Sequence, residues 1–154
     1  MYEPLLFIHS WLRWIVLLAM CYFFVRSLYG WAKKHTWKPA DSHFMWAFNQ
    51  MFAYQVAFGI GIWMALSPFT KAAFKDTALI LESPVIFFWT VRHGLTMILA
   101  IGFFQAAHAK TRRAPESVRF RNYAFVFGIL LLIVASAIPW PGLPHGRNLL
   151  RWMF

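Results

Sequence analysis

Two histidines, each close to an arginine, lie inside long apolar runs of this chain. His9 precedes Arg13 by four residues in PLLFIHSWLRWIVLLAMCYFFV, and Arg92 directly precedes His93 in FFWTVRHGLTMILAIGFF. A helix places residues four apart on one face, so His9 and Arg13 face the same neighbour. Ionisable residues at membrane depth are costly and often mark functional sites. These two pairs are therefore the first candidates for binding chemistry.

Histidines on two facing helices are suited to holding a b-type haem. Neutral imidazole is a good axial ligand for haem iron, and each helix can supply one ring. We expect His9 and His93 as axial ligands, with Arg13 and Arg92 as partners of the two propionates. The same histidines could instead ligate a chlorophyll-type pigment.

A quinone head group is a further alternative for the two histidines. The side chain of Gln55, in the apolar segment FNQMFAYQVAFGIG, could bond a quinone carbonyl. Each of these polar groups also has a purely structural explanation. His9 and His93 could bond a group of a neighbouring helix, and Gln55 could bridge two helices.

The composition is that of an integral membrane protein. Of the 154 residues, 60% are hydrophobic, 20% aromatic and 13% charged, whereas a soluble domain carries about 25% charged residues. Runs of about 20 apolar residues are long enough to cross a bilayer as helices. The net charge of +10 lies mainly between these runs, which indicates contact with anionic lipids and argues against a nucleic-acid partner.

Four apolar runs predict four transmembrane helices, and they cover Leu5–Leu28, Phe44–Leu66, Pro84–Ala107 and Tyr123–Ile138. The predicted fold is a single all-α domain over residues 1–154, an up-down bundle with short loops. The segment Thr70–Ser83 is amphipathic and too short to span. It should form an interfacial helix or a structured loop.

The distribution of lysine and arginine predicts how the bundle is oriented. One side carries nine of them: Arg26, Lys33, Lys34, Lys38, Lys110, Arg112, Arg113, Arg119 and Arg121. The other side carries four: Lys71, Lys75, Arg147 and Arg151. The side with nine should be cytoplasmic, so both termini should be periplasmic if the protein lies in the inner membrane of a bacterium.

This orientation places His9 and His93 together in the outer half of the membrane. No acidic residue lies deep in a span beside Arg13 or Arg92, and the outer carboxylates are Glu3, Asp76, Glu82 and the C-terminus. A buried arginine without a counter-charge costs at least about 2.5–3.5 kcal/mol. We therefore expect an anionic ligand or partner between spans one and three.

Several short segments resemble a small bacterial four-helix inner-membrane family that is loosely described as cytochrome b-like. They are HSWLRWIVLL near the start, the Gln-x-x-x-Gly-Ile segment of span two, the histidine that opens span three, and IPWP at Ile138–Pro141. The resemblance covers most of the chain and implies a bound haem. It maps onto His9, Arg13, Trp14, Gln55 and His93. Members of the family often have an acidic residue before the histidine of span three, where this chain has Arg92.

The leading functional hypothesis is a b-type cytochrome-like subunit that passes electrons within a larger membrane redox complex. The alternative is a non-catalytic accessory subunit of a respiratory or photosynthetic complex, with other membrane subunits and lipids as its partners. The sequence has no paired intramembrane carboxylates, no Gly-rich phosphate loop and no zinc-ligand spacing. Catalysis by this chain alone is therefore not expected.

Overall fold

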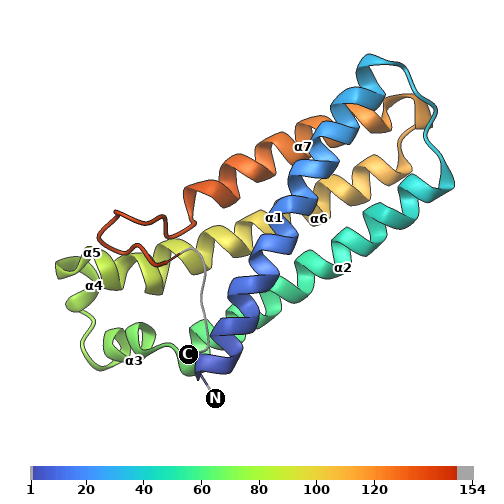
Figure 1. Ribbon diagram of the computed structural model, residues 1–154. Helices are drawn as coiled ribbons and strands as arrows, with labels where there is room; N and C mark the ends of the chain where they lie inside the picture. The colour runs from blue at the N-terminus through green and yellow to red at the C-terminus, as the bar shows by residue number, and fades with distance from the viewer. Residues whose placement is uncertain (1, 149–154) are drawn as a thin grey trace.

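The computed structural model describes residues 2–148 and is all-α in that part of the chain. Three helical stretches are long and apolar enough to cross a membrane: α1 (Tyr2–Ala32), the stretch Pro84–Arg113, and α7 (Glu116–Ser136). The stretch Pro39–Leu66 meets the same criterion of length and apolar character together with α3 (Pro68–Lys75). The two are bent by 44° relative to each other. These helices pack as a bundle (Figure 1), which confirms the predicted fold class.

Two of the long stretches contain a π-helical segment that the sequence pattern does not reveal. Helix α2 (Pro39–Gly61) continues into η1 (Ile62–Leu66). The short helix α5 (Pro84–Phe87) continues into η2 (Phe88–Arg92) and then into α6 (His93–Arg113). Such segments are rare and recur at functional sites.

The segment Thr70–Ser83 is a structured connection, as predicted. It contains most of α3 and the short helix α4 (Leu79–Glu82). Ser67 caps the N-terminus of α3 and Ser83 caps that of α5. In both cases the hydroxyl accepts a hydrogen bond from a backbone amide, and proline occupies the first helical position. These are favoured residues for a helix start.

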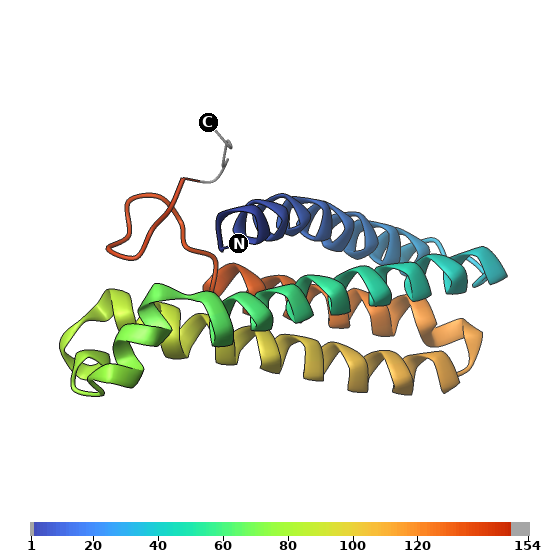
Figure 2. The same cartoon turned by 90° about the horizontal axis from the view of Figure 1, so that it is seen from below.

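The four long stretches form a closed ring in the order of the chain. Helix α1 packs against α2 and α7, and α6 packs against the same two helices, so α1 and α6 are a diagonal pair (Figure 2). The α1–α2 and α6–α7 turns lie together at what we call the hairpin end (Figure 1). The start of α1, helices α3–α5 and the loop after α7 lie at the opposite, terminal end, which confirms the up-down order.

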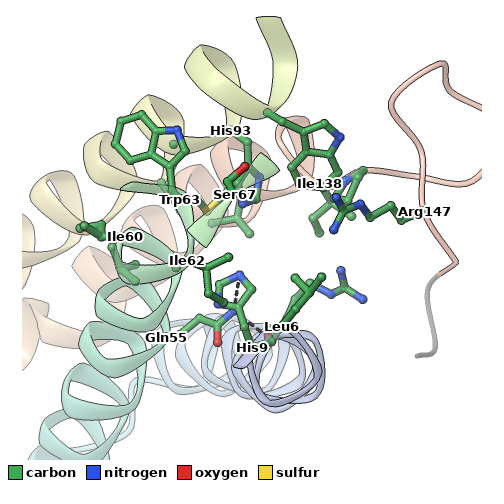
Figure 3. Close-up of a pocket in the computed structure, with 18 of the residues that line it drawn as sticks. Leu6, His9, Gln55, Ile60, Ile62, Trp63, Ser67, His93, Ile138 and Arg147 are labelled. Atoms are coloured by element: carbon green, nitrogen blue, oxygen red, sulfur yellow. Dashed lines mark hydrogen bonds between the residues drawn. The ribbon is translucent and has the colours of Figure 1, made fainter. Parts of the chain in front are cut away.

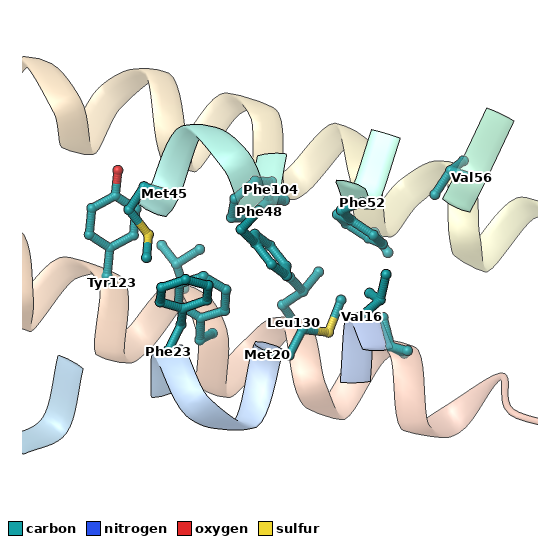
Figure 4. Packing of buried hydrophobic residues seen from close by; sticks show 14 of the residues in the cluster. Val16, Met20, Phe23, Met45, Phe48, Phe52, Val56, Phe104, Tyr123 and Leu130 are labelled. Carbon is teal, nitrogen blue, oxygen red and sulfur yellow. The ribbon is translucent and has the colours of Figure 1, made fainter. Parts of the chain in front are cut away.

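One aromatic ring from each long helix meets at the centre of the bundle (Figure 4). Phe48 of α2 lies 5.5 Å from Phe23 of α1, 5.1 Å from Phe104 of α6 and 5.1 Å from Phe127 of α7, measured between ring centroids. All four side chains are buried. Edge-to-face and stacked ring pairs add to the packing energy of these contacts, so this cluster holds the four helices in register.

The hairpin end is closed by one close backbone approach and one ion pair. A Cβ atom on Gly30 would lie 2.6 Å from the Phe120 ring, so the glycine lets α1 and α7 approach each other. The carboxylate of Asp41 accepts the backbone amide of Lys38 at 2.9 Å, which caps α2, and it pairs with Arg26 at 2.9 Å. The first turn is therefore tied to both helices that it joins.

Two leucines on α7 test this packing directly. Leu130 is 0% exposed within the core and Leu132 is 74% exposed on the outer face. We expect Leu130→Ala to lower the free energy of unfolding by on the order of 3 kcal/mol, because it leaves a cavity among packed rings. Leu132→Ala should change it by less than about 0.5 kcal/mol. Unfolding of detergent-solubilised protein by added dodecyl sulfate measures both, and equal losses would contradict the packing.

Candidate functional site

A pocket opens at the terminal end between the diagonal helices α1 and α6. It has a narrow inner chamber of about 100 Å³ and a wider outer chamber of about 720 Å³. The outer volume lies within the range of roughly 300–1,000 Å³ that is usual for ligand and cofactor sites. The chambers form one continuous pocket because they share lining residues, namely Tyr2, Leu6, His9, Arg13, Phe69, Trp89, His93, Pro139 and Arg147.

Four of the five residues expected at a binding site line this pocket. His9 and His93 enter it from opposite sides (Figure 3), and Arg13 and Gln55 also contribute to its walls. The sequence placed these residues in three different spans. The structure brings them to one site, as a site between spans one and three requires.

Gln55 bridges α2 to His9 on α1. Its Nε2 donates to the backbone carbonyl of His9 at 3.2 Å and lies 3.4 Å from the ring Nε2 of the same residue. An amide nitrogen can only donate, so the ring Nε2 must accept and the ring hydrogen lies on Nδ1. The predicted bridge between two helices is thus confirmed. Among the described residues, it leaves the buried His9 Nδ1–H donor and the buried Gln55 Oε1 acceptor without a hydrogen-bond partner.

Two glycines make room for the rings that line the pocket. A Cβ atom on Gly59 would lie 2.9 Å from Cε1 of His9, and one on Gly94 would lie 2.7 Å from the Trp63 ring. Close approach therefore explains both glycines. A Cβ atom on Gly61 would meet no neighbouring atom within 4 Å.

His93 is held in one orientation by a backbone carbonyl. Its Nδ1 lies 2.8 Å from the carbonyl oxygen of Ala137 at the end of α7. A carbonyl can only accept, so Nδ1 carries the hydrogen and Nε2 keeps its lone pair. The rings of Phe88 and Trp89 flank the imidazole at 5.9 and 5.5 Å. Histidines that ligate metals are usually oriented by a bond of this kind.

Arg92 is the one expected site residue that the structure does not bring to the pocket. Its Nη2 donates to the backbone carbonyl of Ser136 at 3.1 Å, and its guanidinium lies 6.0 Å from the centre of the Phe88 ring. Consecutive residues of an α-helix point about 100° apart, and here His93 turns toward the pocket while Arg92 turns away. Arg92 therefore does not share a ligand with Arg13 in this arrangement.

Arg147 supplies a second cation to the pocket instead. Its guanidinium lies 4.0 Å from the centre of the Trp89 ring and 5.7 Å from that of Phe69. Its backbone amide donates to the carbonyl of Pro139 at 3.1 Å, which closes the loop after α7. In the sequence Arg147 is only one more basic loop residue. The only indication of its position in the sequence is the group of prolines before it, at which the chain turns back.

His145 of the same loop fixes the loop against η2. Its ring stacks on Phe88 with a centroid separation of 3.7 Å and an interplanar angle of 15°. Burial and the charge of nearby Arg92 lower the pKa of His145 below its usual value. The ring is therefore neutral at pH 7, and arginines carry the positive charge of this region.

The two π-helical segments meet at the pocket wall. Trp63 of η1 donates its indole Nε1–H to the backbone carbonyl of Thr90 in η2 at 2.9 Å. The indole also lines the inner chamber, and His93 follows η2 directly. This bond sets the distance between the second and third spans where the site is formed.

The pocket is electropositive. Arg13 and Arg147 line it, and Glu3 is the one carboxylate among the described lining residues. Asp76 and Glu82 do not line it, and the C-terminal carboxylate and Arg151 lie outside the described residues. Within residues 2–148 no group of three or more His, Cys, Asp or Glu side chains is placed to hold a bare metal ion. The two histidines suit a ligand that brings further donor atoms of its own.

No protein-family model, curated protein or solved structure matches this chain. Its function therefore has to follow from the chemistry of the pocket.

The fit between Gly59 and His9 gives a test of this geometry. We expect Gly59→Ala to lower the free energy of unfolding by about 1–3 kcal/mol, because the added methyl group meets the imidazole. The matched change Gly61→Ala enters open space and should be neutral or stabilising by up to about 1 kcal/mol, since alanine favours helix. Thermal unfolding in detergent compares the two variants. A more harmful effect at Gly61 would refute the placement of His9.

Proposed function

We propose that this chain is a b-type cytochrome-like electron-transfer subunit that holds haem in the terminal-end pocket. The observation that carries the proposal is the state of His93. Its Nδ1–H is committed to the carbonyl of Ala137 at 2.8 Å, and its Nε2 lone pair remains for a ligand. Haem supplies one-electron chemistry when it is bound. The chain supplies the ligands, the charge partners and a largely apolar wall.

His9 fits the role of the second axial ligand less directly than His93 fits the first. Its Nε2 now accepts from the Gln55 amide, but the separation of 3.4 Å is long for a hydrogen bond. The shorter bond of that amide goes to the His9 carbonyl and can persist without the ring contact. Exchange of this weak contact for an iron ligand would cost little, so His9 and His93 would be the residues that hold the haem iron.

Two arginines are placed to meet the propionates. Arg13 lies on α1 one turn after His9, and Arg147 lines the same pocket from the loop after α7. Hydrogen bonds from guanidinium to carboxylate are stronger than neutral ones, and they orient the group that they bind. Arg147 thus takes the role expected of Arg92.

The setting that we propose is a bacterial inner membrane with the terminal end on the periplasmic side. The hairpin end gathers the nine basic residues that the positive-inside rule assigns to the cytoplasm. Large apolar side chains face outward along the bundle, among them Leu18, Leu99 and Leu132, each at least 69% exposed. Lipids and neighbouring subunits of a redox complex would cover them, and those subunits would supply the electron donor and acceptor.

An optical spectrum of the purified protein tests the haem proposal. We expect a reduced-minus-oxidised difference spectrum with the Soret and α bands of a b-type haem. His93→Ala should lower the haem content at least about tenfold, because loss of a ligand should cost no less than loss of the residue that orients it. The control His43→Ala alters an exposed ring that bonds the Pro39 carbonyl far from the pocket. A colourless, folded protein would refute the proposal, as would an unchanged spectrum in His93→Ala.

A quinone head group is the second candidate, favoured by the unsatisfied polar atoms of the pocket. His9 Nδ1–H is a buried donor without a described partner, and His93 Nε2 is an acceptor on the opposite side. A quinone carbonyl could accept from His9, and the hydroxyl of the reduced quinol could donate to His93. Trp63 and Trp89 add apolar ring contacts.

Binding of a short-chain quinone separates this candidate from haem. If the pocket holds a quinone, a decyl-substituted quinone should bind the haem-free protein and quench its tryptophan fluorescence. His9→Phe should then weaken binding about tenfold, the value of one good hydrogen bond in a buried site. His43→Phe is the matched control, and it should leave the affinity unchanged. Equal affinities for wild type and His9→Phe would exclude this quinone site.

A further inference from the structure

A second cavity lies at the hairpin end, far from the pocket described above. It has a volume of about 170 Å³ and is formed by α2, α6 and the first turns of α7. Its polar lining residues are Ser42, His108, Arg112, Arg119 and Tyr123, and Trp46 also lines it. No carboxylate is among the described residues that line it. The proposed electron-transfer function makes no use of this cavity.

The His108–Tyr123 pair lines this cavity and carries one polar hydrogen that its mutual bond does not use. Tyr123 is 1% exposed, and its hydroxyl lies 2.9 Å from Nδ1 of His108. A neutral imidazole and a phenol together carry two polar hydrogens, and their mutual bond uses only one of them. Whichever group donates in that bond, one N–H or O–H of these two lining residues remains for another acceptor. A ligand that accepts hydrogen bonds satisfies it.

The two arginines make an acceptor with negative charge the best occupant. Arg119 is held in place because Nε donates to the Ala114 carbonyl at 3.0 Å and Nη1 lies 3.4 Å from Glu116. The Glu116 side chain is 60% exposed, so it neutralises Arg119 weakly. Arg112 adds a second guanidinium. Two guanidinium groups and a neutral donor are the usual surroundings of a bound phosphate.

The position of the cavity points to a phosphate that belongs to a lipid. It lies at the basic end of the bundle, where the membrane-water interface is expected. Trp46, an apolar residue of α2 that lines the cavity, is 62% exposed. An acyl chain can lie along this exposed ring while the head group enters the cavity. Basic pockets between transmembrane helices bind anionic head groups in this way.

We propose that the cavity formed by His108, Arg112, Arg119 and Tyr123 is a specific binding site for the phosphate of an anionic phospholipid such as phosphatidylglycerol. The bound lipid would tie α2 to the α6–α7 turn. It would also anchor this end of the bundle in the cytoplasmic leaflet.

Native mass spectrometry of delipidated full-length protein tests the site. Phosphatidylglycerol should bind about thirtyfold more tightly than phosphatidylcholine with the same acyl chains, if each arginine contributes as basic residues near anionic lipid do. Arg112→Gln should weaken binding about fivefold. The matched control Arg113→Gln removes the charge of the next residue, which is also exposed but does not line the cavity. It should leave the affinity within about twofold of wild type.

Three results would overturn the proposal. Equal losses in Arg112→Gln and Arg113→Gln would show that diffuse surface charge, and not the cavity, attracts the lipid. Full displacement of the lipid by inorganic phosphate would show that the site takes a free anion. Equal affinity for the two lipids in the wild-type protein would remove the charge preference, and this comparison needs no variant.

Discussion

The end of α7 imposes the main constraint on the pocket. The last carbonyl groups of a helix have no partner within it, and each unsatisfied group at membrane depth costs several kcal/mol. Side-chain donors from Arg92, His93 and Trp140 bond the carbonyls of residues 135–137 at distances of 2.8–3.1 Å. A cation at a helix C-terminus also complements its dipole. Arg92 therefore stabilises the end of a helix, and His93 satisfies a carbonyl while it faces the pocket.

The pocket exists because the bundle is filled at its centre and open at one end. Four phenylalanine rings, one from each long helix, occupy the middle and hold the diagonal helices α1 and α6 apart. Toward the terminal end, contacts of other kinds hold the helices together. The π-helical segments are joined there by the Trp63–Thr90 bond, and Gly59 and Gly94 let rings pack against backbone. The space left between α1 and α6 receives the histidines, and Gln55 and Arg13 add polar groups to its largely apolar walls.

Positive charge serves different purposes at the two ends of the molecule. At the terminal end, Arg13 and Arg147 line a pocket large enough for a cofactor. At the hairpin end, Arg26 pairs with Asp41 and stabilises a turn, while Arg112 and Arg119 line a small cavity. The surplus of basic residues that indicates membrane orientation in the sequence thus divides among ion pairs, the linings of two cavities and exposed loop charge.

The sequence by itself determined the all-α class, the four apolar stretches and their up-down order, because the thickness of the bilayer sets helix length and short loops join antiparallel neighbours. It also identified His9, Arg13, Gln55 and His93, because polar groups stand out in apolar runs. The sequence could not indicate the π-helical segments, which depend on contacts between helices. Nor could the sequence show that Arg147, and not Arg92, lines the pocket. Which arginine lines the pocket depends on the rotation of α6 against α7 and on the path of the loop after α7. Only tertiary packing decides both.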